Sequence, residues 1–149
     1  MAAQIFMFLG EYQHSIDDKG RLAIPVKFRS LLKVGAVVTR GVDRCLFVYT
    51  RNDWAELAGR IAKLPISQAN SRAFARHMLA GAMDLEIDGQ GRVLVPDYLR
   101  QYAGLKRQIV VAGLYNRLEL WDHKAWQEYR RRTEKGSGDI AEALGELGV

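Results

Sequence analysis

The sequence predicts an α+β fold built from two copies of a ββαββα unit, and three observations lead to that prediction. First, DDKGRLAIP at 17–25 returns as DGQGRVLVP at 88–96. Second, both stretches are flanked by residues that alternate between apolar and polar, as in half-buried strands. Third, apolar residues at helical spacing follow each stretch. With one inserted residue the register continues to Trp54 and Trp126, so two units of roughly 45 residues account for most of the chain.

The first unit opens with a strand and a tight turn. Residues 12–16 alternate, and the letters DDKG that follow are typical of a turn in which Asp holds the loop backbone and Gly20 takes a positive φ. Leu22 and Ile24 then resume the alternation toward the core. This leaves Arg21 on the other side of the strand, at the mouth of the turn.

The rest of the first unit predicts a short helix, two strands and a longer helix. Pro25 ends the second strand and begins the helix VKFRSLLKVG. The stretch AVVTRGVDRCLFVYT predicts two strands joined at Gly41, and the helix after them is expected to start at Asn52 or Asp53.

The second unit repeats this order. Residues 83–87 alternate, DGQG forms the turn, and DYLRQYAG predicts a short helix that ends near Gly104. The stretch QIVVAGLYNRLELWD predicts two strands joined at Gly113, with a helix after them. A hairpin of two strands has too little core to be stable alone, so each unit needs the other.

We therefore expect five segments along the chain. One further helix is predicted between the units, after Pro65 and before Gly81. The Gly-rich, acidic end GSGDIAEALGELGV is expected to be loosely held or to form a short docking segment. The segments are an N-terminal extension at 1–6, the first repeat at 7–54, connecting helices at 55–81, the second repeat at 82–126, and a C-terminal helix with a flexible tail at 127–149.

Composition limits the class of protein. The 149 residues suffice for one ordinary domain or two small ones, and 48% apolar content is enough for a core. No run approaches the ~20 apolar residues of a membrane span, and the opening MAAQIFMFLG lacks the basic region and cleavage pattern of a signal peptide. Cys45 stands alone, which favours a cytoplasmic location without a disulfide inside the chain. The net charge of +5 permits a polyanionic partner without requiring one.

Arginines recur at the same positions of both units. Most Asp–Gly turns are only turns and most loop arginines are solvated, so either turn alone is weak support for a binding site. Nothing in such a turn requires an arginine beside the glycine, yet Arg21 returns as Arg92, and Arg29 returns as Arg100. The recurrence predicts a basic surface with internal symmetry, where guanidinium groups bind phosphate or a guanine edge.

The first unit is expected to make the stronger contact with an anion. It has Lys19 and Lys27, which the second unit replaces by Gln90 and Tyr98, and it adds Lys33. Because phosphate charge supplies most of the affinity for nucleic acid, we expect the two turns to contribute unequally.

Enzymatic sites are not expected. His14, His77 and His123 are scattered without metal-ligand spacing to Cys45, whose strand context favours a buried thiol over a nucleophile. The sequence has no Walker loop and no G-x-G-x-x-G motif, so neither a cofactor nor a small-molecule substrate is expected. The two aligned tryptophans at the helix starts are interpreted as core anchors.

Three stretches of the chain resemble one family. MFLGEYQHSIDDKGRLAIPVKFRSLL, DGQGRVLVPDYLRQYAGL and LELWDHKAW are similar to the MraZ family of transcriptional regulators, within the AbrB-like swapped-hairpin DNA-binding superfamily. The resemblance implies two AbrB-like units interleaved around one pseudo-twofold, β-barrel-like core with flanking helices, and homo-oligomers that form rings. It also implies binding to short direct repeats in the promoter of the division and cell-wall gene cluster, as a nucleoid-associated repressor that acts on its own gene as well.

The same resemblance implies DNA contacts in the D-x-K-G-R turn at 17–21. The second copy of the turn keeps the glycine and the arginine but lacks the lysine. The residues expected to bind double-stranded DNA are Lys19, Gly20, Arg21, Lys27, Arg29, Gly91, Arg92 and Arg100.

One alternative from another class stays open. The chain is then a protein-interaction module or an antitoxin-like partner with the same fold and no role at a promoter. A standalone antitoxin usually devotes a disordered tail to its toxin, and the tail here is short with few apolar residues. Salt-dependent binding to a promoter fragment separates the two hypotheses.

Overall fold

The predicted order of strands and helices is present in both units. The computed structural model describes residues 7–148, so the extension predicted at 1–6 lies outside the described residues. The first unit contains β1 (Phe8–Ser15), β2 (Arg21–Ala23), α1 (Val26–Leu32), β3 (Ala36–Arg40), β4 (Leu46–Thr50) and α2 (Arg51–Ala62). The second contains β5 (Met83–Leu85), β6 (Arg92–Leu94), α4 (Asp97–Ala103), β7 (Gln108–Tyr115), β8 (Leu118–Asp122) and α5 (His123–Lys135). Between the units, α3 (Ala69–Ala75) runs into a π-helical turn (Arg76–Ala80), and α6 (Ser137–Leu144) is followed by a 3-10 turn (Gly145–Leu147).

The strands exchange partners between the units. A six-stranded antiparallel sheet has the order β1-β7-β8-β4-β3-β5, and β2 and β6 form a separate two-stranded ribbon. β1 of the first unit pairs with β7 of the second, and the equivalent β5 pairs with β3 of the first. The two units are therefore related by a pseudo-twofold, and each supplies strands that the other needs.

The core is not the β-barrel-like structure that the sequence analysis predicted. β1 and β5 are the opposite edges of an open sheet. β2 and β6 have three residues each and pair with one another, and a single bridge, Ile16–Leu22, links the end of the first strand to β2. Strands this short cover one face of the sheet but do not close it into a barrel.

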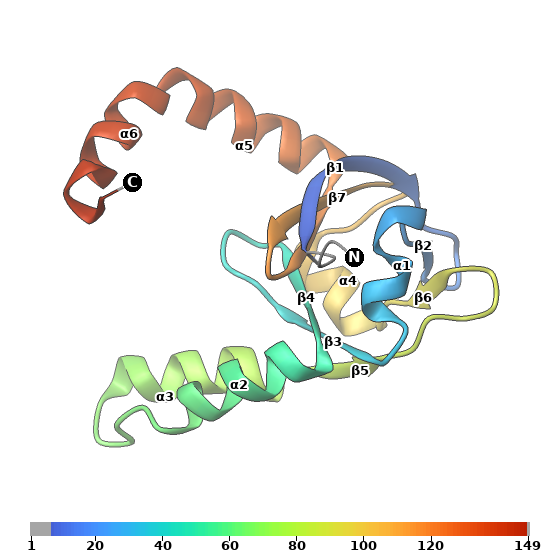
Figure 1. The fold of residues 1–149 in the computed structure, drawn as a ribbon, viewed down its shortest axis with the longest axis horizontal. Coiled ribbons are helices and arrows are strands. Elements are labelled where there is room, and N and C mark those ends of the chain that lie inside the picture. The colour runs from blue at the N-terminus through green and yellow to red at the C-terminus, as the bar shows by residue number, and fades with distance from the viewer. Residues whose placement is uncertain (1–6, 149) are drawn as a thin grey trace, which may run out of the picture.

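Apolar side chains are buried on both faces of the sheet. The β2–β6 ribbon, α1 and α4 cover one face, where Phe28, Leu22 and Leu99 are fully buried. α2, the π-helical turn and the start of α5 cover part of the other face, around Tyr49 and Trp121. Figure 1 shows α2–α3 and α5–α6 projecting as two arms on the side opposite the β1–β2 and β5–β6 turns.

The turn predicted at Gly113 is wrong. Gly113 lies inside β7, which ends at Tyr115, a residue with a φ of 65°. β7 is longer than predicted because it pairs with the whole of β1, where Gly113 is opposite Gly10. A Cβ at Gly113 would lie 2.6 Å from the backbone nitrogen of Leu9, so the glycine permits this close approach of the two strands.

One helix boundary also differs from the structure. α2 starts earlier than expected, because the hydroxyl of Thr50 caps it by accepting the N–H of Asp53 at 3.3 Å. At the other end of the chain, the segment expected to be loosely held or to form a short docking segment contains the helix α6. The short helix of the second unit ends as predicted at Gly104, which has the left-handed conformation.

Candidate nucleic-acid interface

The first D-x-x-G-R turn is held by its own aspartate. Oδ1 of Asp17 accepts the backbone N–H of Lys19 at 3.0 Å and that of Arg21 at 2.9 Å, while Oδ2 accepts Nε of Arg21 at 2.6 Å. Gly20 has a φ of 88°, which favours glycine over any residue with a side chain. The turn therefore orients the arginine side chain as well as the backbone, and 39% of that side chain stays exposed.

The second turn repeats this geometry. Oδ1 of Asp88 accepts the N–H groups of Gln90 and Arg92, both at 2.9 Å, and Oδ2 accepts Nε of Arg92 at 3.0 Å. Gly91 has a φ of 77°. The expectation that nothing in the turn requires an arginine is thus wrong, because in both copies the arginine completes the hydrogen bonding of the aspartate.

These contacts favour the charged form of both aspartates. The backbone N–H of Arg21 is the main cause that lowers the pKa of Asp17 below its ordinary value, with further help from the Arg21 side chain. The backbone N–H of Arg92 likewise lowers the pKa of Asp88. Each turn therefore holds a carboxylate and a guanidinium as an ion pair at neutral pH.

An arginine of the first unit supports the turn of the second. Nε of Arg29 donates to the carbonyl of Ile24 at 2.8 Å. Its guanidinium occupies the space that a Cβ on Gly91 would need. The carbonyl of Gly91 in turn accepts the N–H of Ile24 at 2.9 Å, so the end of one strand and the turn of the other unit are joined.

Arg100 does the same for the turn of the first unit. Nε of Arg100 donates to the carbonyl of Val95 at 3.1 Å, and a Cβ on Gly20 would lie 3.0 Å from it. The N–H of Val95 donates to the carbonyl of Gly20 at 2.8 Å. The recurrence of these two arginines in the sequence therefore has a structural cause, which sequence reasoning missed.

The ribbon brings the two turn arginines onto one surface. β2 and β6 pair with Arg21 opposite Leu94 and Ala23 opposite Arg92. Residues opposite one another, and residues two apart along a strand, lie on the same face of a ribbon. The outward face of the ribbon is therefore formed by Arg21, Ala23, Arg92 and Leu94, and the inward face by the buried residues Leu22 and Val93.

Leu94 was not among the predicted site residues. It is 58% exposed, and on the outward face it adjoins both arginines, with Arg21 across from it and Arg92 two residues before it. Because Val93 and Val95 point toward the core, the residue between them points outward, so the alternation in the sequence could have identified Leu94.

The lysines of the first unit lie in three different places. Lys19 is exposed at the tip of its turn, while Nζ of Lys27 lies 3.5 Å from the carbonyl of Leu9 at the beginning of β1. Lys33 lines a groove of about 620 Å³ between α1 and the second turn, together with Arg29. Of the predicted lysines, the structure therefore places Lys19 on a turn beside the ribbon.

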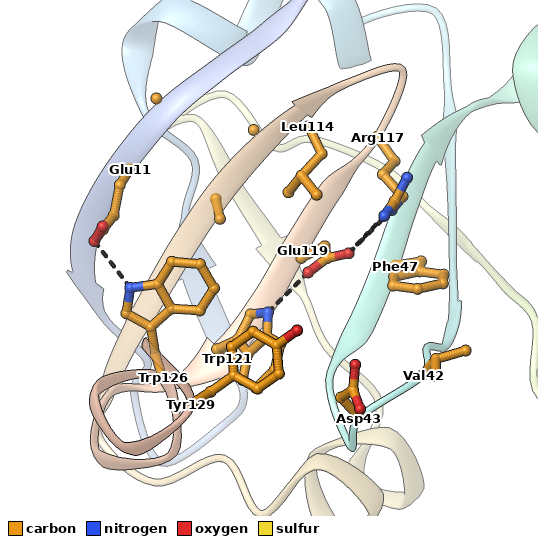
Figure 2. A pocket seen from close by; sticks show the side chains of 13 residues that line it. Glu11, Val42, Asp43, Phe47, Leu114, Arg117, Glu119, Trp121, Trp126 and Tyr129 are labelled. Carbon is orange, nitrogen blue, oxygen red and sulfur yellow. Dashed lines mark hydrogen bonds and ion pairs between the residues drawn. The ribbon is translucent and has the colours of Figure 1, made fainter. Parts of the chain in front are cut away.

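A second hollow, of about 580 Å³, lies on the other face of the sheet (Figure 2). The buried carboxylate of Glu119 accepts Nε1 of Trp121 at 2.9 Å and Nε of Arg117 at 3.0 Å. Glu11 accepts Nε1 of Trp126 at 2.9 Å, and the rings of Trp121 and Trp126 are 5.2 Å apart. The carboxylates of Glu119 and Glu11 are thus engaged by neighbouring donors, and Trp126 packs against the core as predicted.

Cys45 and His77 both have structural contacts. Cys45 is buried, its Sγ donates to the carbonyl of Val42 at 3.2 Å, and burial raises the pKa of its thiol far above the ordinary value. Nε2 of His77 lies 2.9 Å from the carbonyl of Gly41. Within residues 7–148, no three His, Cys, Asp or Glu side chains gather as a metal site would require, and no helix is both long and apolar enough to span a membrane.

Comparison with known proteins gives one consistent match. Two consecutive segments, 7–77 and 78–145, each match the family described as "MraZ protein, putative antitoxin-like". A protein of Moorella thermoacetica named transcriptional regulator MraZ is 49% identical over 138 residues, which cover 93% of this chain and 96% of the relative. Relatives with the same name in Halothermothrix orenii and Roseiflexus castenholzii are both 46% identical, over 96% and 95% of this chain and 100% and 99% of their own.

Proposed function

Because the chain belongs to the MraZ family, we propose that it is a DNA-binding transcriptional regulator that contacts DNA with the outward face of the β2–β6 ribbon and the two adjoining turns. The observation that supports this most strongly is the position of Arg21 and Arg92 on one face of one ribbon, each oriented by its own aspartate. Oriented guanidinium groups lose little freedom when they bind phosphates or guanine edges.

The ribbon suits the major groove. The major groove of B-DNA admits a two-stranded β-ribbon, and arginine recognises guanine there through O6 and N7. Lys19 adds a charge at the tip of the first turn. Gly20 and Gly91 are buried beneath Arg100 and Arg29, so their proposed part is to give the two turns the shape that presents the arginines. Arg29 and Arg100 use Nε inside the protein, and Nη2 of Arg100 also lies 3.6 Å from Oδ1 of Asp97. We propose that the terminal nitrogens of Arg29 and Nη1 of Arg100 bind phosphate.

Lys27 has a smaller proposed part in DNA binding. Its Nζ reaches toward the carbonyl of Leu9 rather than toward a turn, so its contribution is long-range attraction of the phosphate backbone. The other proposed DNA-binding residues lie on the ribbon or on the turns and helices next to it.

We further propose that the target is a set of short direct repeats in the promoter of the division and cell-wall gene cluster, where the protein represses transcription, including that of its own gene. Direct repeats share one orientation and need a binding surface with a direction, unlike a palindrome. The pseudo-twofold ribbon has such a direction, because Lys19 at one turn corresponds to Gln90 at the other. Promoter binding implies a cytoplasmic protein at the nucleoid.

The proposed assembly is a ring of identical copies held by surfaces outside the turns. A single protomer offers few cations, which gives weak and salt-sensitive binding, whereas several protomers on tandem repeats gain avidity. Strand exchange between the units supports the swapped-hairpin description of each protomer. The two arms present exposed apolar residues suited to contact another copy, namely Leu64, Ile66 and Phe74 on one arm and Ile140, Leu144 and Leu147 on the other.

An antitoxin-like role is the second candidate, favoured by the wording of the family description. In that case a partner protein would bind the arms or the aromatic hollow, and the ribbon would have no preferred DNA sequence. The two candidates make different predictions for the ribbon arginines, because only the first requires them.

The test is binding of the full chain to a labelled duplex from upstream of its own gene, measured by fluorescence anisotropy over a salt series. We expect the promoter duplex to bind more tightly than a scrambled duplex of equal composition, with log K falling linearly as log salt rises. Equal affinity for the two duplexes would contradict the proposed function. Light scattering across a dilution series, with one repeat or several in tandem, tests the ring; a monomer that binds one repeat as tightly as several would exclude it.

A further inference from the structure

Leu94 is the one large apolar side chain on the outward face of the ribbon. It lies directly opposite Arg21 in the β2–β6 register, and Arg92 is two residues before it on the same face. The equivalent residue of the first unit is Ala23, opposite Arg92. The two units therefore place their arginines symmetrically, and their apolar residues asymmetrically.

The two arginines that adjoin Leu94 limit what it can contact. A second copy of the ribbon on this face would bring four arginines and two copies of Lys19 into one interface, which concentrates like charge there. A polyanion complements those charges, and the base edges of the major groove carry one apolar group, the C5-methyl of thymine. A leucine beside two phosphate- or guanine-binding arginines, on one side of the ribbon centre, would meet the base edges in one half of the site.

We propose that Leu94 is a specificity-determining residue that packs against the C5-methyl group of a thymine, and that this contact, together with the difference between Lys19 and Gln90, gives the pseudo-symmetric ribbon its direction on DNA. The inference rests on the proposed function and deepens it, because it names a feature of the DNA that the ribbon reads. Ala23 is too short to make the same contact at the equivalent position, so the protein distinguishes one half of its site from the other.

The test removes the methyl group without changing any hydrogen bond of the base. Each thymine of the protected promoter segment is replaced singly by deoxyuridine, and binding is measured for the wild type, Leu94→Ala and the control Leu9→Ala. Leu9 is an exposed leucine on β1, 46% accessible, so it matches the substitution away from the ribbon. Thermal melting and light scattering verify that both variants keep their stability and assembly.

We expect one thymine at which deoxyuridine weakens wild-type and Leu9→Ala binding roughly fourfold, as for the loss of one buried methyl-sized group. Leu94→Ala should bind the thymine duplex and the deoxyuridine duplex with equal affinity, close to the affinity of the wild type for the deoxyuridine duplex. The inference would be overturned if deoxyuridine weakened the binding of Leu94→Ala as much as that of the wild type, or if no thymine of the site were sensitive in the wild type. Promoter binding itself would stand in either case. Failure of the wild type to prefer promoter over scrambled DNA would instead overturn the proposed function, and the inference with it.

A second variant tests the direction of the ribbon. The exchange Ala23→Leu with Leu94→Ala moves the leucine to the equivalent position of the first unit. We expect the sensitive position to move to the other side of the site centre. An unchanged position in the exchanged protein would show that the leucine does not determine it.

Discussion

In both D-x-x-G-R turns an aspartate accepts two backbone N–H groups and pairs with an arginine four residues later, but the chemistry around the two turns differs. The first has Lys19 at its tip where the second has Gln90, and the arginine–aspartate distance is 2.6 Å in the first and 3.0 Å in the second. Each turn also joins its unit to the other through the carbonyl of its glycine. Both turns need the same backbone conformation because each joins the two units, whereas the charge of the residue at the tip of the turn can differ.

The largest expected effect comes from adding a side chain at Gly20. Gly20→Ala would place a Cβ 2.8 Å from the backbone oxygen of Val95 at a φ of 88°, so we expect the free energy of unfolding to fall by roughly 2–4 kcal/mol. Gly91→Ala should cost less, because the atoms it meets belong to the side chain of Arg29, which can move. Urea unfolding measures both.

Gly89→Ala is the matched control for these two variants, since a Cβ there meets nothing within 4 Å. A loss of stability in Gly20→Ala no larger than that in Gly89→Ala would mean that the first turn does not join the units.

Arg21→Ala is expected to weaken promoter binding about ten- to a hundredfold, because it removes a guanidinium from the ribbon face. The free energy of unfolding should change by less than about 1 kcal/mol, since the ion pair with Asp17 is partly exposed. Anisotropy and thermal melting measure the two quantities. The control is Arg130→Ala, which removes an arginine of α5 that is paired with Glu11 of β1. This variant should bind the promoter as tightly as the wild type.

Arg21 would be excluded from the interface by unchanged affinity. Lost affinity together with lost stability would assign it a structural part only.

A smaller effect is expected from the charge difference between the turns. Lys19→Gln should weaken binding about fivefold near 0.1 M salt and reduce the salt slope by about 0.9, whereas Gln90→Ala should leave both nearly unchanged. Gln90→Lys should increase the slope by a similar amount. Salt titrations of the three variants provide the comparison, and equal losses in Lys19→Gln and Gln90→Ala would refute the asymmetry.

The smallest effect concerns pH. The pKa values of Asp17 and Asp88 are lowered in the folded protein, chiefly by the backbone N–H groups of Arg21 and Arg92. A lowered pKa stabilises the fold fully above the ordinary value of 3.8, and this contribution is lost as pH falls through the folded-state value. The double variant Asp17→Asn with Asp88→Asn should therefore be less stable than the wild type at pH 6, with a gap that narrows below about pH 4.

Urea unfolding at several pH values measures this gap, with Asp18→Asn as the control for loss of a carboxylate beside the turn. A gap that stays constant between pH 6 and pH 3 would mean that neither aspartate is linked to folding.

Local features were predictable from the sequence, and pairings between units were not. Alternation placed Leu22 inward and Arg21 outward, and the same rule gives the direction of Leu94. That β2 pairs with β6 of the other unit depends on the packing of both units, which no local pattern specifies. Gly113 resembled a turn residue, but its lack of a side chain serves the close approach of β1.

The supporting role of Arg29 and Arg100 was hidden for a similar reason. Each bonds a carbonyl five residues earlier in its own unit, but it packs on a glycine of the other unit. Recurrence of an arginine in the sequence shows that the position matters, and it does not separate a binding role from a structural one. The site was therefore predicted as a set of basic residues, and its geometry came from the structure.

The most direct measurement of the central claim, that the ribbon and its turns contact DNA, is cleavage of the promoter duplex by an iron chelate attached to chosen positions. Because Cys45 is buried, the reagent attaches to a new cysteine at Gln90→Cys, on the second turn, or at Gln68→Cys, an exposed polar position on the α2–α3 arm. We predict strong cleavage within the protected repeats from position 90 and little from position 68. Cleavage from position 68 without cleavage from position 90 would contradict the account.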